Sequence, residues 1–280
     1  MAIDLGRVGV WMRSYGRSDE ELAAAAREIE RLGYGAIWLG RADPSLRPAE
    51  AMLAATERIA VATGIVSIWD APAAKVAANQ RRVSTAHPDR FLLGLGTSHG
   101  PSVGDRYRKP LTALRTYVDE LDAAGVPTQE RILAALGPKA LQLAAERSLG
   151  AHPYLVTTDY TAGARKAIGS SFLATEQMVV LDGDPDRALA IARAGVSNPY
   201  FTFPNYLNNL RRSGFTDADF ENSGSDRLIR ALVGMPDRQA IATRVQEQFD
   251  AGSDHVCIQV LTASGADPLR ELATLSEVLL

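Results

Sequence analysis

Residues 131–143, RILAALGPKALQL, contain the junction that decides the fold: an apolar run ends on Gly137, and Pro138 begins a helical pattern directly behind it. Proline suits the first helical position, because the N–H that it lacks would have no partner there. Gly137 leaves room for a ligand, and the free N–H groups of a first helical turn point outward, as a bound phosphate requires. The stretch therefore predicts a strand-to-helix unit, either as an ordinary turn or as a phosphate site.

Similar units recur along the whole chain. Near-continuous apolar runs, typical of parallel strands covered on both faces, predict strands over residues 7–11, 36–39, 59–67, 90–96, 132–136, 151–156, 172–181 and 255–261. The first helix starts at the capping pair Ser18 and Glu21 and ends at Gly33. Further helices are expected over residues 48–58, 72–86, 110–124, 138–148, 162–168 and 268–280. Eight such strands in 280 residues predict an α/β fold, a (β/α)8 TIM barrel, as one domain over residues 1–280. A doubly wound open sheet is the alternative.

One segment exceeds what a barrel needs. About 50 residues, 182–234, separate the seventh strand from the helix before the eighth, and long insertions usually form lids or binding walls or are disordered. The insertion contains NPYFTFPNYLNNLRRSGF at residues 198–215, which is aromatic and not of low complexity. We therefore expect an ordered wall at the C-terminal ends of the strands, where barrel active sites lie.

The composition is that of an ordinary globular protein. With 46% hydrophobic residues and a net charge of −3, the chain has a sizeable core and no global basic field for nucleic acid or an anionic membrane. We find neither a secretory signal nor an apolar run near the ~20 residues that span a bilayer, so a cytoplasmic location is expected. Cys257 lies in an apolar run and is expected to be a buried thiol. The histidines lack ligand spacing, so no metal site is expected.

Several motifs, in order and over nearly the whole chain, carry a resemblance to a known family. They are TGIVSIW (63–69), RFLLGLGTSHG (90–100), DRYRKPLTALRTYVDEL (105–121), LGPKALQLAAERSLGAHPYLVT (136–157), PNYLNNLRRSGFTDADF (204–220) and DAGSDHVCIQVL (250–261). The chain resembles the luciferase-like monooxygenase superfamily, in particular its actinobacterial branch of coenzyme F420-dependent oxidoreductases. The resemblance implies a barrel that binds a flavin or a deazaflavin at the C-terminal strand ends, with the phosphate at the start of the fifth helix.

The resemblance also implies cofactor contacts. Leu136, Gly137, Pro138 and Lys139 would hold the phosphate, with Lys139 adding charge to the backbone donors. Gly94 and Gly96 would leave space for the flat ring, unless they serve close strand packing instead. Members of the family often have a non-prolyl cis peptide bond after strand three, which would fall near Val66, Ser67 and Ile68 and bulge beneath the ring.

His99 is the first candidate for a catalytic acid or base. It follows strand four, where related deazaflavin enzymes carry an acidic group near the ring, and an imidazole titrates close to neutral pH. Alternatively, His99 hydrogen-bonds a loop or the ring without transferring a proton. His152 and Tyr154, expected at the end of strand six, are the second candidates. His87 is expected to end helix three, and His255 to start the last strand.

Aromatic and amide side chains are expected to shape the substrate space, unless they only pack the top of the barrel. They are Trp11, Trp69, Tyr154, Tyr200, Asn205, Tyr206 and Asn209. Four cations could meet the acidic tail of the deazaflavin, or lie on a solvated face: Arg41, Lys109, Arg211 and Arg212.

Two departures from the family bear on the chemistry. Dehydrogenase relatives have an Asp-His pair after strand two, where this chain has Gly40, Arg41 and Ala42; many relatives have Ala-Asp-Gly at strand six, where it has Gly150, Ala151 and His152. The expected function is hydride transfer between coenzyme F420 and a small-molecule substrate, by a homodimer. The alternatives are an FMN-dependent monooxygenase and a non-catalytic cofactor-binding barrel.

Overall fold

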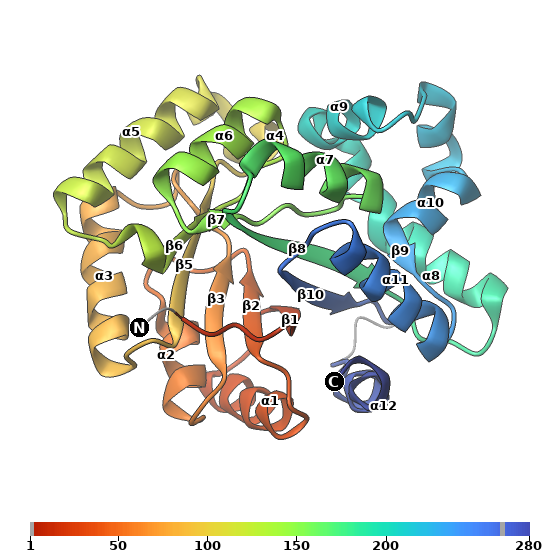
Figure 1. The fold of residues 1–280 in the computed structure, drawn as a ribbon, viewed down its shortest axis with the longest axis horizontal. Helices are drawn as coiled ribbons and strands as arrows, with labels where there is room; N and C mark the ends of the chain where they lie inside the picture. Colours follow the sequence, from red (N-terminus) through yellow and green to blue (C-terminus); the bar gives the residue numbers. More distant parts are fainter. Residues whose placement is uncertain (1–2, 264–266) are drawn as a thin grey trace.

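The computed structural model describes residues 3–263 and 267–280, and within them the parallel sheet closes on itself. β10 pairs in parallel with both β1 and β8, so the sheet has no open ends and the doubly wound alternative is wrong. The barrel strands are β1 (Val8–Arg13), β2 (Ala36–Gly40), β3 (Ala60–Gly64) continued by β4 (Val66–Ser67), β5 (Phe91–Gly96), β6 (Arg131–Leu133), β7 (Gly150–Ala151), β8 (Phe172–Val179) and β10 (His255–Val260). The predicted TIM barrel is thus confirmed (Figure 1).

The largest error in the predicted strands is at the sixth. Residues 151–156 were expected to be extended, but β7 ends at Ala151, and the ladder goes no further than the bonds from the His152 N–H to Leu133 O and from the Glu176 N–H to Pro153 O. Pro153 has no N–H to continue the ladder, and Leu155 has a left-handed φ of 55°. His152 and Tyr154 therefore lie in the loop that follows β7, above the barrel.

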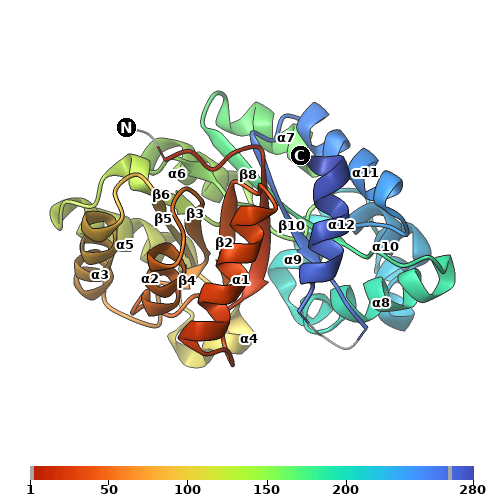
Figure 2. The same cartoon turned by 90° about the horizontal axis from the view of Figure 1, so that it is seen from below.

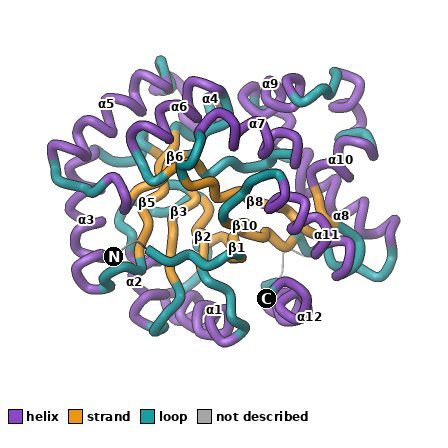
Figure 3. The backbone as a smooth tube through the Cα atoms, in the orientation of Figure 1, coloured by secondary structure: helices purple, strands orange, loops and turns teal. Residues whose placement is uncertain are grey.

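A ring of helices surrounds the strands (Figure 3). The helices are α1 (Asp19–Arg31), α2 (Arg47–Ala54), α3 (Ala73–Ala86), α4 (Gly100–Val103), α5 (Pro110–Ala123), α6 (Pro138–Arg147), α7 (Thr158–Ile168), α11 (Arg238–Asp250) and α12 (Leu269–Leu279). The predicted capping box of α1 is present, since the Glu21 N–H bonds to Ser18 Oγ and the Ser18 N–H to Glu21 Oε2. α12 packs beside α1 and closes the ring (Figure 2).

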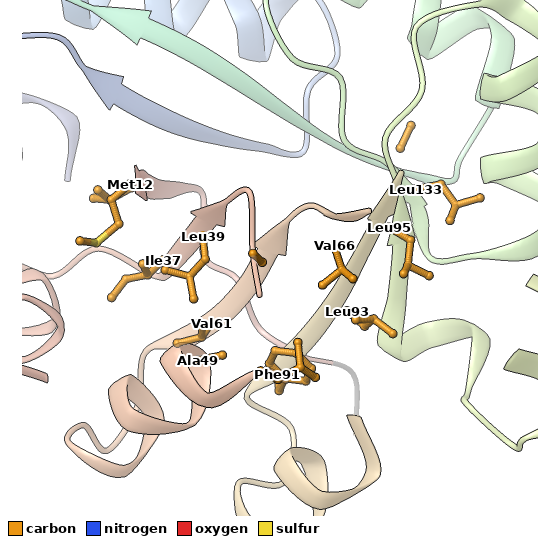
Figure 4. Packing of buried hydrophobic residues seen from close by; sticks show 14 of the residues in the cluster. Met12, Ile37, Leu39, Ala49, Val61, Val66, Phe91, Leu93, Leu95 and Leu133 are labelled. Carbon is orange, nitrogen blue, oxygen red and sulfur yellow. The ribbon is translucent and has the colours of Figure 1, made fainter. Parts of the chain in front are cut away.

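The strands bury two separate layers, because alternate side chains point to opposite faces. The outer layer joins strands to helices and includes Ile37, Val61 and Leu93 (Figure 4). The inner layer fills the bore with Trp11, Ala36, Trp38, Ala60, Ala62, Leu92, Ile132, Ala174 and Cys257. Cys257 is a buried free thiol, as predicted. Residues of the inner layer near the C-terminal strand ends form the floor of the barrel mouth.

The insertion over residues 182–234, expected to form a wall, is mainly helical, which the sequence analysis had not predicted. It contains α8 (Pro185–Ser197), the short helices η3 (Tyr200–Thr202) and η4 (Asp217–Ser223), α9 (Pro204–Arg212), α10 (Asp226–Leu232) and β9 (Val233–Gly234). These elements share their own apolar cluster, which includes Val196, Leu210 and Leu228. In Figure 1 they gather on one side of the barrel, in cyan to light blue.

Replacing Gly94 by alanine should destabilise the barrel. A Cβ at Gly94 would overlap the Thr63 carbonyl oxygen, in a contact that is fixed by the Gly94 N–H bond to Thr63 Oγ1 at 2.7 Å. Overpacking of this kind costs about 1–3 kcal/mol in the free energy of unfolding. Urea denaturation should show this loss for Gly94→Ala and a gain of up to about 1 kcal/mol for Gly163→Ala, whose site on helix α7 is open. Equal stability of Gly94→Ala and the parent would contradict the packing.

Candidate functional site

Trp11 forms the floor of the barrel mouth. Its indole points into the bore from β1 and is only 7% exposed. A Cβ at Gly40 would overlap the indole ring, and a Cβ at Gly64 would lie 3.1 Å from Trp11 Nε1. The ring therefore extends across the C-terminal ends of β2 and β3, and the glycines on these two strands make room for it.

His152 lies beside this floor and is neutral. Its Nδ1 is 2.8 Å from the Ala174 carbonyl oxygen, which can only accept, so Nδ1 carries the proton and Nε2 a lone pair. The ring stacks on Trp38 with 4.2 Å between centroids. Burial lowers the pKa of His152 to about 4, since the charged form would lose its hydration.

The free ring nitrogens of Trp11 and His152 face a common point. A Cβ at Gly64 would lie 3.1 Å from Trp11 Nε1 and 3.2 Å from His152 Nε2. Both atoms are buried and have no hydrogen-bond partner within the described residues. One is a donor and the other an acceptor, so a hydroxyl group or a water molecule between them would satisfy both.

Glu176 is a buried carboxyl group in the same region, which the sequence analysis missed. It lies on β8, is 1% exposed, and accepts the Leu155 N–H at Oε2 over 3.1 Å. Its other oxygen, Oε1, has no partner among the described residues. Burial raises the pKa of Glu176 to about 8, and the Leu155 N–H opposes this only in part. The one charged residue in the run FLATEQMVVL was an available signal.

A cluster of tyrosines joins the barrel to the insertion. The Tyr154 hydroxyl lies 2.6 Å from the Tyr200 hydroxyl and donates to Gln259 Oε1 over 2.9 Å. The Tyr154 ring also contacts Trp11 at 5.5 Å and Tyr206 at 6.2 Å between centroids. The predicted wall residues Trp11, Tyr154, Tyr200 and Tyr206 thus come together, although they derive from four separate elements.

His99 contacts the insertion. Its ring stacks on Phe203 with 4.3 Å between centroids, and Nδ1 lies 3.2 Å from Asn205 Oδ1. Burial lowers the pKa of His99, and the nearby charge of Arg41 lowers it further, although the Asn205 bond opposes both. The partner of His99 therefore lies on helix α9, and not on a loop. This hydrogen bond assigns the proton to Nδ1 and leaves the Nε2 lone pair as a proton acceptor.

The N-terminus of α6 has the features expected of an anion site. Pro138 begins the helix, Gly137 precedes it, and no side chain caps it. Nothing within the described residues lies within 4 Å of a Cβ built at Gly137. Tyr160 fixes the junction, since its hydroxyl lies 3.0 Å from Ala135 O and 3.1 Å from Leu136 O. Burial raises the Tyr160 pKa, and the positive charge of Arg212 acts in the opposite direction, so the insertion brings a cation toward this junction.

The candidate cations differ in their partners. Arg211 forms an ion pair with Asp217 at 2.6 Å and is thereby occupied. Arg212 donates to Asn209 Oδ1 at 3.0 Å, and Arg41 lies over the Tyr15 ring at 5.9 Å. Within the described residues, no carboxylate forms an ion pair with Arg41, Lys109 or Arg212. These three cations are therefore the ones available to an acidic ligand.

Strands three and five correct two expectations. The non-prolyl cis bond joins Gly64 to Ile65, just before the expected Val66, Ser67 and Ile68. Gly94 is explained by the Thr63 carbonyl group, and a Cβ at Gly96 would lie 3.0 Å from both Ala134 Cβ and Ile65 Cγ1. Both glycines are therefore closely packed against their neighbours, which is the alternative that the sequence left open for them.

The remaining predicted residues lie around this centre. Trp69 is half-buried beyond β4, and its Nε1 donates to Thr97 O over 2.7 Å. It lines a separate cavity of about 390 Å³ together with Lys109 and Tyr117. His87 ends α3, and His255 begins β10 and receives a hydrogen bond from Trp38 Nε1, as structural roles require. The described residues contain no cluster of His, Cys, Asp and Glu that could hold a metal ion.

The protein should lose stability as the pH falls from 6.5 toward 4. Unfolded His152 takes up a proton near pH 6.5, whereas burial lowers its pKa to about 4 in the fold, so acid favours the unfolded state over this interval. His255 acts in the same direction. Denaturation series between roughly pH 4.5 and 7 should show a smaller loss for His152→Asn, which keeps a donor toward Ala174 O. An identical pH dependence in parent and variant would contradict the neutral assignment.

Comparisons with known proteins agree with this architecture. Residues 2–125 match the family described as luciferase-like monooxygenase, and no curated protein matches the chain. An F420-dependent secondary alcohol dehydrogenase, solved with an F420-acetone adduct, has a TM-score of 0.73 at 14% identity over 97% of each chain. The coenzyme F420-dependent tetrahydromethanopterin reductase of Methanopyrus kandleri has a TM-score of 0.72 at 14% identity, over 98% of this chain and 99% of that one.

An FMN complex is similar as well. The oxygenating constituent of 3,6-diketocamphane monooxygenase from Pseudomonas putida has a TM-score of 0.68 at 13% identity, over 100% of this chain and 98% of that one. Identities this low carry information about the fold alone. No helix within the described residues is both long and apolar enough to cross a membrane. The protein is thus a TIM barrel of the luciferase-like type, and its N-terminal residues 2–125 carry the sequence pattern of the luciferase-like monooxygenase family.

Proposed function

We propose that this protein is an oxidoreductase that binds coenzyme F420 at the barrel mouth and moves hydride between the deazaflavin and a small organic substrate. The observation that carries the proposal is the open, uncapped N-terminus of α6 at Gly137, which lies at the same strand ends as the unpartnered Trp11 Nε1 and His152 Nε2. An anion site beside unpartnered polar groups fits a phosphorylated cofactor with a reacting partner.

Residues of the mouth divide the work of holding such a cofactor. The backbone N–H groups of Gly137 and Lys139 would bind its phosphate, with the helix dipole and the Lys139 charge in support. Arg41 and Arg212 would meet carboxylates of its tail. The bound deazaflavin would supply hydride exchange at its ring. Trp11, Tyr154, Tyr200, Asn205 and Tyr206 would shape the space for the substrate.

An FMN-dependent monooxygenase is the second candidate. It is supported by the likeness to the FMN-bound oxygenating constituent, whose fold covers the whole chain. The same α6 site would hold the FMN phosphate, since FMN ends in that group. The two candidates differ in the tail, because FMN has no carboxylated extension for the free cations.

Separate fluorescence titrations with F420 and FMN test the proposal. We expect saturable binding of F420 that is tighter than that of FMN, and turnover with some member of a panel of enones, nitroaromatics, alcohols and imines. Tight FMN binding without an F420 response would support the monooxygenase instead. Saturable F420 binding without any turnover would support a non-catalytic barrel.

Gly137→Val should weaken binding in the same titration. The valine branches would occupy the space that the phosphate needs. The variant should still fold, because any residue can adopt the φ of −87° at this position and the surroundings are open. We expect at least a tenfold higher Kd, or about 1.4 kcal/mol, with an unchanged urea midpoint. Gly163→Val, at another open glycine, is the matched control. An unchanged Kd in Gly137→Val would place the phosphate elsewhere.

His99→Ala should lower turnover more than affinity. If the Nε2 lone pair accepts a proton beside the ring, kcat should fall by ~10²-fold at saturating cofactor, whereas a lost hydrogen bond alone changes Kd by ~1 kcal/mol. Asn205→Ala is the control, because it removes the partner of Nδ1 and leaves the imidazole in place. Wild-type turnover in His99→Ala would move the search for the proton acceptor to His152 and Tyr154.

A further inference from the structure

Unpartnered buried polar atoms are concentrated in the bore. Of the four such side-chain atoms within the described residues, three are Trp11 Nε1, His152 Nε2 and Glu176 Oε1. They lie on β1, in the loop after β7 and on β8, and the fourth, Asn209 Nδ2, lies on α9. Buried polar groups are almost always hydrogen-bonded, so atoms without partners point to a polar ligand in this region.

The position of the Glu176 carboxyl is fixed by the loop after β7. Oε2 accepts the Leu155 N–H, and the left-handed φ of 55° at Leu155 belongs to the chain turn that presents this donor. Leu155 follows the end of β7 by four residues, so the carboxyl reaches toward the mouth and away from the closed end of the barrel. Oε1 remains for another partner.

The surroundings of Glu176 disfavour its ionised form. The titratable groups that feel its charge are Tyr154 in the β7–α7 loop, Tyr200 on η3, Tyr206 on α9 and Cys257 on β10. Burial raises the pKa of each of them, so none offers a counter-charge near neutral pH. Within the described residues, no Arg, Lys or His forms an ion pair with Glu176.

A second buried carboxylate, Asp219, has the hydrogen-bond partners and the counter-charge that are typical of a structural role. Asp219, in the insertion, binds the Thr216 N–H, Ser225 Oγ and the Arg227 guanidinium, and these bonds lower its pKa. Both of its oxygens are occupied, and its charge is balanced. Glu176 has one backbone donor, one free oxygen and no cation, which is the arrangement of a carboxyl group that keeps its proton.

We infer that Glu176 is a catalytic acid, which donates from Oε1 the proton that accompanies hydride transfer to the substrate. The inference rests on the proposed function and adds a residue to it. In the reducing direction, a bound reduced deazaflavin would supply the hydride for the new C–H bond at one end of the substrate double bond and would be left oxidised. The π electron pair moves to the other atom, which takes the proton from Oε1 as the O–H bond of Glu176 breaks. The carboxylate then regains a proton from water.

The assignment pairs Glu176, a proton donor, with His99, a proton acceptor. Burial holds Glu176 protonated and holds His99 neutral with a free lone pair, so the mouth contains one acid and one base at neutral pH. A substrate atom that accepts a proton, such as a carbonyl oxygen, an imine nitrogen or the carbon of an activated alkene, is the kind that Glu176 would serve.

The first test uses the protein without cofactor, in denaturation series at several pH values. The pKa of Glu176 is raised from 4.5 to about 8, so stability is lost as the pH rises through that interval. Glu176→Gln keeps the shape and an acceptor for Leu155. The ratio of the folding constants of parent and variant should fall about tenfold per pH unit within the interval. Glu146→Gln, at an exposed carboxylate on α6, should give a constant ratio.

The second test measures steady-state kinetics with F420 and the best substrate of the panel. For Glu176→Gln, kcat should fall by ~10²-fold or more with the cofactor Kd within threefold, as for a lost general acid. The loss of parent activity above about pH 8 should disappear from the pH profile of the residual rate.

Each outcome decides the assignment. A parent-to-variant stability ratio that stays constant with pH, or wild-type kcat in Glu176→Gln, would overturn it while leaving the proposed function intact. A parent protein that binds neither F420 nor FMN would contradict the proposed function itself, and the catalytic assignment with it. If Glu176→Gln does not fold, infrared spectroscopy of the parent decides instead, since a protonated carboxyl band that disappears near pH 8 is required.

Discussion

The bore of this barrel is filled by side chains, and the two largest of them are Trp11 and Trp38. Trp38 lies at its centre, completely buried, and Trp11 covers it at the mouth. Rings of this size leave space for little else, so alanines and glycines face them on β2 and β3. Because protein interiors are closely packed, large rings require small residues opposite them.

Burial at the mouth sets the protonation states of the site. The same loss of hydration lowers the pKa of His152 and His99 and raises that of Glu176, because it penalises whichever form is charged. No ion pair with a described residue compensates Glu176, in contrast to the surface carboxylates of the chain. The mouth is therefore a region of neutral donors and acceptors. Such a region suits the transfer of a proton next to the transfer of a hydride.

The insertion packs aromatic side chains against the barrel mouth. Tyr200, Phe203 and Tyr206 extend the apolar surface of the barrel over Tyr154 and His99. Its apolar cluster includes Leu155, Met178 and Val180 of the barrel, and aromatic contacts and single hydrogen bonds add to this packing. Arg212 carries a charge from the insertion toward the α6 junction. One segment thereby contributes residues both to the candidate substrate space and to the candidate anion site.

The sequence by itself determined the order of strands and helices, the barrel, the start of α6 at Pro138 and the capping box of α1. These features depend on local patterns: alternating apolar runs, proline at a first turn, and paired Ser18 and Glu21. It also identified the insertion and most aromatic residues of the wall. Only the tertiary structure decided that β7 ends before His152, that Gly94 meets the Thr63 carbonyl group, and that Glu176 Oε1 is buried with no partner among the described residues. These outcomes depend on which strands become neighbours and how far each is shifted, and the energy of a buried charge depends on every group around it. The apolar pattern of one strand contains no information on its neighbours or on the groups around a buried charge.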